Sequence, residues 1–160
     1  MIIQNKKKLK TIIEEAKAQN KSVLIKKGCF DIIHPGHVLC IQRFAKLADV
    51  VIILVMSDRA VRARKGKERP INPQKERALV MDGIKGVDYV YPDKTNTNEE
   101  YIELLDYLKP TMLNILCNTQ KKNEFCRPYW KLTVCEDNKE YGTSTTTMIN
   151  SILKKYKTEK

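Results

Sequence analysis

The sequence predicts an α/β protein with a doubly wound, mainly parallel sheet of about five strands. Short apolar runs alternate with segments of helical periodicity along the 160 residues. The run Val50–Val55 is continuous and β-branched, which is typical of a strand buried on both faces of a parallel sheet. Two strand-helix units follow each other closely, and such units join through right-handed crossovers. We expect one domain spanning residues 1–160.

Residues 6–18 have apolar side chains at helical spacing and predict an amphipathic helix within an N-terminal segment of residues 1–20. A strand over 22–27 leads into a loop, and a helix is predicted over 35–47. The buried strand 50–55 follows. Each boundary rests on a change from one periodicity to the other.

The second half continues the alternation. Ser57 and Asp58 can cap a short helix, and Asn72-Pro73 opens another with Pro73 in its first turn. The remaining predictions are strands over 87–91, 111–117 and 130–135, helices over 98–108 and 144–156, and a basic tail over 157–160.

The net charge of +11 is compatible with nucleic acid, an anionic membrane surface or phosphorylated small molecules. The sequence has no apolar run of 18 residues and no apolar signal core, so we expect no membrane insertion and a cytoplasmic location. Its five cysteines are widely spaced without a C-x-x-C pair, which disfavours both a disulfide framework and a protein-held metal.

The two histidines of the chain, His34 and His37, fall in one turn between a strand and a helix. A single loop histidine is usually just a solvated polar residue, but two in a glycine-bracketed turn favour phosphate binding. Imidazoles can donate hydrogen bonds to phosphate oxygens, and the N–H groups of a helix start face anions. Gly28 and Gly36 allow the backbone to approach a ligand closely.

A basic segment follows the second strand, with six cations around Gly66: Arg59, Arg62, Arg64, Lys65, Lys67 and Arg69. Aromatic residues are not interleaved, so a phosphate on a small ligand fits better than single-stranded nucleic acid. A flexible cationic loop can close over a triphosphate and neutralise charge on pyrophosphate. Lys65 and Arg69 are the chosen candidates, and Arg77 is a candidate for a substrate phosphate. Solvated surface charge remains the alternative for Arg59, Arg64 and Lys67.

The segment Gly142–Thr146 precedes the last predicted helix. A capped helix start needs one hydroxyl, whereas this segment has several in Ser144, Thr145 and Thr146. Together with free N–H groups they would form a second phosphate site at the same edge of the sheet as the histidine turn.

Residues 28–37 resemble the G-x-F-D-x-x-H-x-G-H signature of the cytidylyltransferase-like nucleotidyltransferases, and every fixed position matches. The family implies a Rossmann-like fold and a reaction in which a substrate phosphate attacks the α-phosphorus of a triphosphate. It also carries an S-T-T motif at its last helix. The segment S-D…K-G…R-P-x-N-P resembles the branch that transfers adenylate to heptose 1-phosphate, whereas glycerol-phosphate cytidylyltransferases share the first and last motifs.

The resemblance implies roles for the residues that match it. The histidines would stabilise the triphosphate, and Lys46 would offset charge with them. Nucleotide contacts would come from the rest of the turn, the basic loop and the last turn: Gly28, Cys29, Phe30, Asp31, Gly36, Lys65, Arg69, Ser144, Thr145 and Thr146. Cys29 would act through its backbone, its alternative being an inert small apolar residue. Asp31 would orient water or magnesium, or make structural hydrogen bonds. Mg²⁺ is expected to arrive with the nucleotide.

The sequence departs from the family at two places. Ala45 stands where relatives commonly have a basic residue, and Lys46 follows at a position rotated by about 100° on a helix. Ile115–Asn118 stands where the heptose branch has K-G-x-D. This departure leaves the identity of the acceptor undetermined and is compatible with reduced transferase activity.

The resulting hypothesis is nucleotidyl transfer from ATP or CTP to a phosphorylated small molecule, with a sugar phosphate preferred. The alternatives are a cytidylyltransferase acting on glycerol phosphate, phosphoethanolamine or phosphocholine, and a nucleotide-binding module without turnover. Nucleic-acid binding through the basic loop ranks lowest, since it leaves the histidine turn unexplained. A homodimer is common among relatives.

Overall fold

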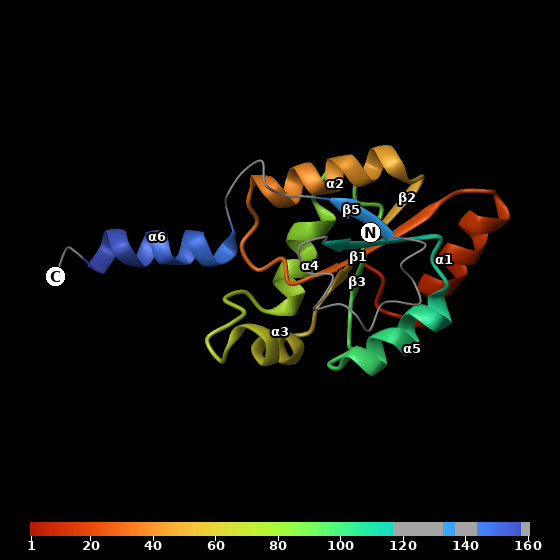
Figure 1. Ribbon diagram of the computed structural model, residues 1–160. Coiled ribbons are helices and arrows are strands. Elements are labelled where there is room, and N and C mark those ends of the chain that lie inside the picture. The colour runs from red at the N-terminus through yellow and green to blue at the C-terminus, as the bar shows by residue number, and fades with distance from the viewer. Residues whose placement is uncertain (117–132, 137–143, 158–160) are drawn as a thin grey trace.

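Five parallel strands form one sheet in the computed structural model, which describes residues 1–116, 133–136 and 144–157 (Figure 1). The strands are β1 (Val23–Gly28), β2 (Val50–Val55), β3 (Tyr89–Pro92), β4 (Met112–Leu116) and β5 (Thr133–Glu136). Their order is β3-β2-β1-β4-β5, and every neighbouring pair is parallel. The chain therefore winds outward in both directions from β1, and ligands of such sheets bind at the carboxyl ends near that reversal.

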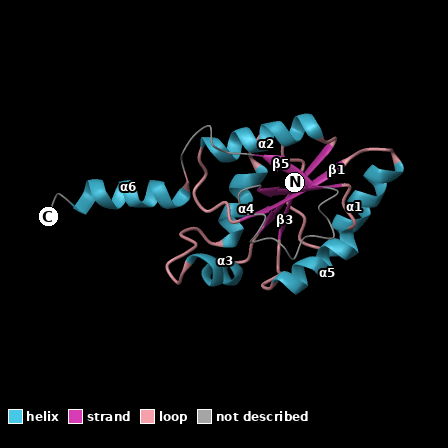
Figure 2. Cartoon of the chain, in the orientation of Figure 1, coloured by secondary structure: helices cyan, strands magenta, loops and turns pink. Residues whose placement is uncertain are grey.

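Helices cover both faces of the sheet (Figure 2). They are α1 (Lys6–Ala18), α2 (Pro35–Leu47), α3 (Asp58–Lys65), α4 (Gln74–Asp82), α5 (Asn98–Leu108) and α6 (Thr145–Lys157). α1 and α5 pack on one face and contribute Leu9, Ile13, Leu104 and Leu105 to a core there. α2 and α4 contribute Ile41, Phe44, Ala78 and Met81 to the core on the other face.

The alternation of side chains along β1 and β2 separates these two cores. Val23 and Ile25 belong to the core under α1 and α5, whereas Leu24 between them belongs to the core under α2 and α4. β2 is buried from Val51 to Val55, which is why its sequence is continuously apolar instead of alternating. The predicted doubly wound α/β class is confirmed.

Some boundaries differ from the predictions. The strand predicted over 87–91 is β3 at Tyr89–Pro92; just ahead of it, the amide of Val51 donates to the Asp88 side chain at 2.7 Å instead of to a backbone carbonyl. Pro73 is the N-cap of α4 and not in its first turn. Cys117, residues 130–132 and the tail after Lys157 lie outside the described residues. The single domain stays a prediction.

Helix α6 projects from the body and ends near the C-terminus (Figure 1). Its outer residues Ile152, Leu153 and Tyr156 are exposed. Across the described ranges, no helix combines the length and apolar character needed to cross a membrane.

Candidate functional site

The histidine turn joins the carboxyl end of β1 to the start of α2. His34 is the N-cap residue, and Pro35 opens the helix. The His34 carbonyl accepts the His37 amide at 2.9 Å, so both imidazoles belong to the first turn of α2. The helix therefore presents its N-terminal N–H groups and two imidazoles at one place, beside the strand where the winding reverses.

The two imidazoles lie against each other. Their ring centroids are 3.9 Å apart with 31° between the planes, and the Phe30 ring contacts His37 edge-on at 5.5 Å. Gly36 allows this arrangement, since a Cβ there would lie 3.1 Å from Nδ1 of His34. Both Nδ1 atoms are buried and have no hydrogen-bond partner among the described residues. Such atoms are costly unless a ligand or water satisfies them.

Both histidines are neutral at pH 7 in the ligand-free protein. Burial is the largest cause that lowers the pKa of His37 to about 4, and repulsion from Lys26 and, in acid, from a protonated His34 adds to it. Burial also lowers the pKa of His34. A neutral imidazole keeps one N–H donor and one acceptor nitrogen, so the pair can still donate to phosphate oxygens.

Asp31 fixes the far side of the turn to the basic loop. Its carboxylate accepts hydrogen bonds from Nε of Arg69 at 2.6 Å and from the backbone amides of Ile71 and Asn72 at 3.0 and 2.9 Å. Burial alone would raise the pKa of Asp31, but these hydrogen bonds outweigh burial and hold that pKa below its ordinary value. Of the two roles open in the sequence, the geometry supports structural hydrogen bonding.

Arg77 lies beneath the turn instead of facing a ligand. Only 1% of it is exposed. Its guanidinium donates to the carbonyls of Cys29, Met56 and Asn72 and to the Asp58 carboxylate. The prediction that it binds a substrate phosphate finds no support here, because burial separates the group from solvent. Arg77 joins the histidine turn, the end of β2 and the basic loop.

Cys29 shows no sign of a reactive thiol. Burial raises the pKa of its thiol despite the opposing charge of Arg77, so the group is protonated at pH 7. Its contribution is the backbone carbonyl that Arg77 holds. Gly28 is covered by the Phe30 ring, where a Cβ would lie 2.6 Å from the nearest ring carbon.

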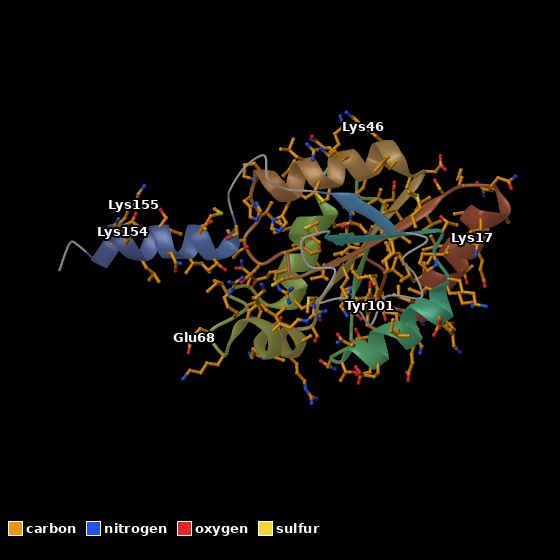
Figure 3. All side chains as sticks on the ribbon, viewed as in Figure 1. Lys17, Lys46, Glu68, Tyr101, Lys154 and Lys155 are labelled. Atoms are coloured by element: carbon orange, nitrogen blue, oxygen red, sulfur yellow. The ribbon has the colours of Figure 1, made fainter. Side chains whose placement is uncertain are left out.

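The other predicted cations, Lys65 and Lys46, lie on different helices. Lys65 is in the exposed last turn of α3, and its charge makes a small contribution that opposes the raised pKa of the Cys29 thiol. Lys46 lies in the last turn of α2, roughly 13 Å along the helix from His37. Figure 3 shows its side chain extending outward from α2. The geometry gives no support to a catalytic role for Lys46.

The start of α6 lies next to the histidine turn. The Thr145 hydroxyl donates to the Ile32 carbonyl at 3.3 Å. Ser144 and Thr147 cap each other, since each backbone amide donates to the other hydroxyl, at 2.7 and 3.1 Å. Ser144 therefore serves as a cap, and Thr146 is exposed. Gly142 and Thr143 lie outside the described residues.

The donor groups at the site limit how a metal could be held there. Within the described ranges, no three His, Cys, Asp or Glu side chains gather in a way that could hold an ion. Both carboxylate oxygens of Asp31 accept hydrogen bonds from the basic loop. This donor set fits Mg²⁺ held mainly by triphosphate oxygens and water, the usual arrangement for nucleotide-bound Mg²⁺.

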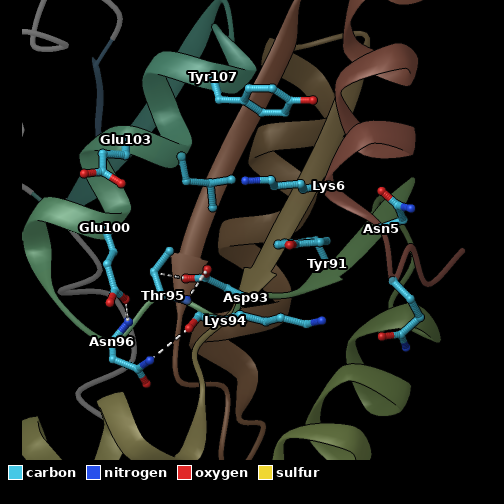
Figure 4. Close-up of a pocket in the computed structure, with 12 residues that line it drawn as sticks. Asn5, Lys6, Tyr91, Asp93, Lys94, Thr95, Asn96, Glu100, Glu103 and Tyr107 are labelled. Atoms are coloured by element: carbon cyan, nitrogen blue, oxygen red, sulfur yellow. Dashed lines mark hydrogen bonds between the residues drawn. The ribbon is translucent and has the colours of Figure 1, made fainter.

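A separate cavity of about 590 Å³ lies on the α1 and α5 side of the sheet (Figure 4). The fully buried Asp93 lines this cavity. Its carboxylate forms an ion pair with the Lys27 ammonium at 2.7 Å and accepts a hydrogen bond from the Thr95 amide at 3.0 Å. Asn96, in the same loop, accepts the Ser57 hydroxyl at 2.8 Å. These bonds tie the end of β3 to the start of α3.

Sequence reasoning missed the residues that organise the site from below. Lys26 and Asn114 are buried within β1 and β4, and the Asp58 carboxylate accepts a hydrogen bond from Arg77. A lysine within an apolar strand was the available signal for Lys26. Of the strand end that departs from the K-G-x-D pattern, Ile115 and Leu116 belong to β4, whereas Cys117 and Asn118 lie outside the described residues.

A family model described as "Cytidylyltransferase-like" matches residues 25–158, which include the histidine turn, the basic loop and α6. The chain belongs to the cytidylyltransferase-like family. The resemblance of residues 28–37 is thereby confirmed at the level of the family.

Among relatives, the "Bifunctional protein HldE" of Actinobacillus pleuropneumoniae serotype 5b (strain L20) is 39% identical over 94 residues, or 59% of this chain. The protein of that name from Hahella chejuensis (strain KCTC 2396) is 39% identical over 105 residues, or 66% of this chain. The matched parts are 20% and 21% of those proteins. The chain thus spans about a fifth of these curated relatives.

The solved structures support the fold. Pantoate-beta-alanine ligase from Francisella tularensis superposes with a TM-score of 0.61 at 13% identity, covering 94% of this chain and 76% of that one. At this identity the likeness concerns the fold alone. It agrees with the parallel sheet and helix layers described above.

Proposed function

We propose that this protein transfers a nucleoside monophosphate from ATP or CTP to a sugar phosphate and releases pyrophosphate. The observation that carries the proposal is the pair of stacked, neutral imidazoles at the start of α2, with buried Nδ1 atoms that have no hydrogen-bond partner among the described residues. Membership of the cytidylyltransferase-like family and similarity to HldE proteins support it.

In this proposal the triphosphate lies across the first turn of α2 and the first turn of α6. His34 and His37 hydrogen-bond its phosphates, and the N–H groups of both helix starts add partial positive charge. Lys65 and the remaining guanidinium nitrogens of Arg69 face the leaving pyrophosphate. Gly28, Gly36 and Phe30 shape the floor, and Thr145 and Thr146 line the opposite side.

The chemical step requires no covalent intermediate on the protein. An oxygen of the acceptor phosphate attacks the α-phosphorus in line, a new P–O bond forms, and the bond to the β-phosphate bridging oxygen breaks. Positioning and charge stabilisation are the protein's contribution. Mg²⁺ bound to the triphosphate would neutralise part of its charge.

The acceptor is the finer part of the proposal. A sugar phosphate such as heptose 1-phosphate is preferred, because the basic loop has the R-P-x-N-P pattern and an HldE protein is 39% identical over 94 residues of this chain. Glycerol phosphate, phosphoethanolamine and phosphocholine with CTP are the second candidates. The departure at Ile115–Asn118 motivates testing them.

The test is a pyrophosphate-release assay with ATP and CTP across a panel of sugar, polyol and amino-alcohol phosphates. We expect release that depends on one triphosphate and is fastest with a sugar phosphate. Release from CTP with glycerol phosphate, phosphoethanolamine or phosphocholine, and not with a sugar phosphate, would assign the second candidates. Triphosphate binding without release across the panel would support a nucleotide-binding module and contradict the proposal.

A further inference from the structure

Two adjacent lysines lie in the second half of β1, ahead of its last residue Gly28, and their side chains lie on opposite faces of the sheet. Lys27 meets Asp93 and the Tyr101 ring on the side of α1 and α5. Side chains alternate between the two faces along a strand, so Lys26 lies on the same face as Leu24, two residues before it. Leu24 packs in the core under α2. The Lys26 side chain therefore lies on the same face of the sheet as the histidine pair.

Lys26 is held in place within the sheet. It is 9% exposed, and its ammonium donates to the Asn114 side-chain oxygen at 2.6 Å. Asn114 is the β4 residue directly opposite Lys26 in the parallel register, and it is 5% exposed. The contact spans the place where the order of strands reverses, which is where ligands of doubly wound sheets bind.

The Lys26 charge reaches the histidine pair. It is the smallest of the three causes that lower the pKa of His37, after burial and the neighbouring His34, and it agrees with the position of Lys26 on the face of the sheet that α2 covers. A buried ammonium on the same face of the sheet as the two imidazoles favours an anion there. Of the cations predicted from the sequence, Lys46 extends away from the body, and the guanidinium of Arg77 donates to the Met56 carbonyl and the Asp58 carboxylate.

We propose that the ammonium of Lys26 binds a phosphate group of the nucleoside triphosphate beside His37. This inference rests on the proposed function, because it assumes a triphosphate at the histidine turn. Lys26 would supply a positive charge from the sheet, complementing the cations of the basic loop. Charge that grows on the phosphates as the bond to the α-phosphorus breaks would be stabilised without a proton transfer.

The first experiment measures binding of the α,β-methylene analogues of ATP and CTP by calorimetry. Lys26→Met should raise the Kd of the preferred analogue roughly 10- to 100-fold, because a charge-assisted hydrogen bond is lost. Lys21→Met is the matched control. It removes the same charge from an exposed position ahead of the amino end of β1 and should leave the Kd within threefold.

The second readout follows His37 by NMR in the ligand-free protein. Lys26→Met should raise the pKa of His37, since one cause of its low value is removed. Lys26→Arg keeps the charge, so both the low pKa and most of the affinity should remain. If Lys26→Met does not fold, the Lys26 side-chain signals of the unaltered protein should still shift on addition of the analogue.

The outcomes separate this inference from the proposed function. A Kd within threefold of the unaltered protein for Lys26→Met, or no shift of the Lys26 signals, overturns the inference. Failure of the unaltered protein to bind either analogue overturns both proposals. Weakened binding in Lys26→Met, with no pyrophosphate from any acceptor, supports the role of Lys26 and contradicts the transfer reaction.

Discussion

A neutral His37 changes what the turn offers to an incoming ligand. An imidazolium would attract anions at long range, but burial keeps the ring uncharged at pH 7. Attraction must then come from Lys26, the basic loop and the helix starts, whereas the imidazoles supply short-range hydrogen bonds. The negative charge of a bound triphosphate favours the protonated form of His37 and raises its pKa.

At the residue scale, the low pKa of His37 predicts a loss of stability in mild acid. The folded-state pKa of about 4 is below the ordinary value of 6.5, so the unfolded chain binds more protons between them. The free energy of unfolding should fall as the pH drops from about 6.5 to 4, by at most about 3 kcal/mol from this group. Urea unfolding at pH 4 and pH 7 measures the change.

Asp31 also loses stabilising charge in acid, so a variant must isolate the histidine. His37→Gln should show a smaller difference between the two pH values than the unaltered protein. Equal differences in the two proteins would show that His37 titrates normally.

The same side chain should matter for turnover. His37→Ala is expected to lower kcat by about 100- to 10,000-fold, because a donor aimed at developing charge is lost. Thermal unfolding monitors whether the fold is kept. Lys46→Ala is the comparison, and it should stay within threefold since Lys46 is exposed at the far end of α2. Near-normal kcat in His37→Ala would rule out the assigned role.

At the element scale, buried side chains hold the site's loops together. Asp31 fastens the basic loop, and Arg77 fastens the histidine turn and the end of β2 to it. The helices at 35–47 and 98–108 were predictable to the residue, because their periodicity and caps are local features. The surroundings of Arg77 and Lys46 were not predictable from the sequence, since the burial of Arg77 and the direction of the Lys46 side chain depend on tertiary packing.

Arg77→Met should therefore act on stability. It leaves the carbonyls of Cys29 and Met56 and the Asp58 carboxylate without their donor, at a cost of about 3 to 5 kcal/mol. Denaturant unfolding measures this cost. Arg64→Met, at an exposed position of α3, should change stability by less than about 0.5 kcal/mol. Unchanged stability together with a raised KM for the acceptor would contradict this structural role and support the prediction that Arg77 binds a substrate phosphate.

At the scale of the whole molecule, the donor site combines parts from both ends of the chain. The sheet supplies Lys26, the first crossover supplies the histidines, and α6 returns to the same edge through Thr145. The rest of α6 extends from the body with most side chains exposed (Figure 1). We therefore expect α6 to contribute more to ligand binding than to the stability of the core.

Removal of residues 144–160 tests that division. We expect the shortened chain to bind the triphosphate analogues at least tenfold more weakly, because one of two helix starts is lost. Its melting temperature should fall by only a few degrees. Calorimetry and thermal unfolding give the two values, and unaltered affinity would exclude α6 from the site.

The most direct test of nucleotidyl transfer follows the phosphorus atoms themselves. ATP or CTP labelled at the α- or the γ-phosphate is incubated with the accepted sugar phosphate, and the products are separated. We predict the α-label in the acceptor product and the γ-label in pyrophosphate. A γ-label on the acceptor, or release of γ-label as inorganic phosphate without acceptor product, would contradict attack at the α-phosphorus.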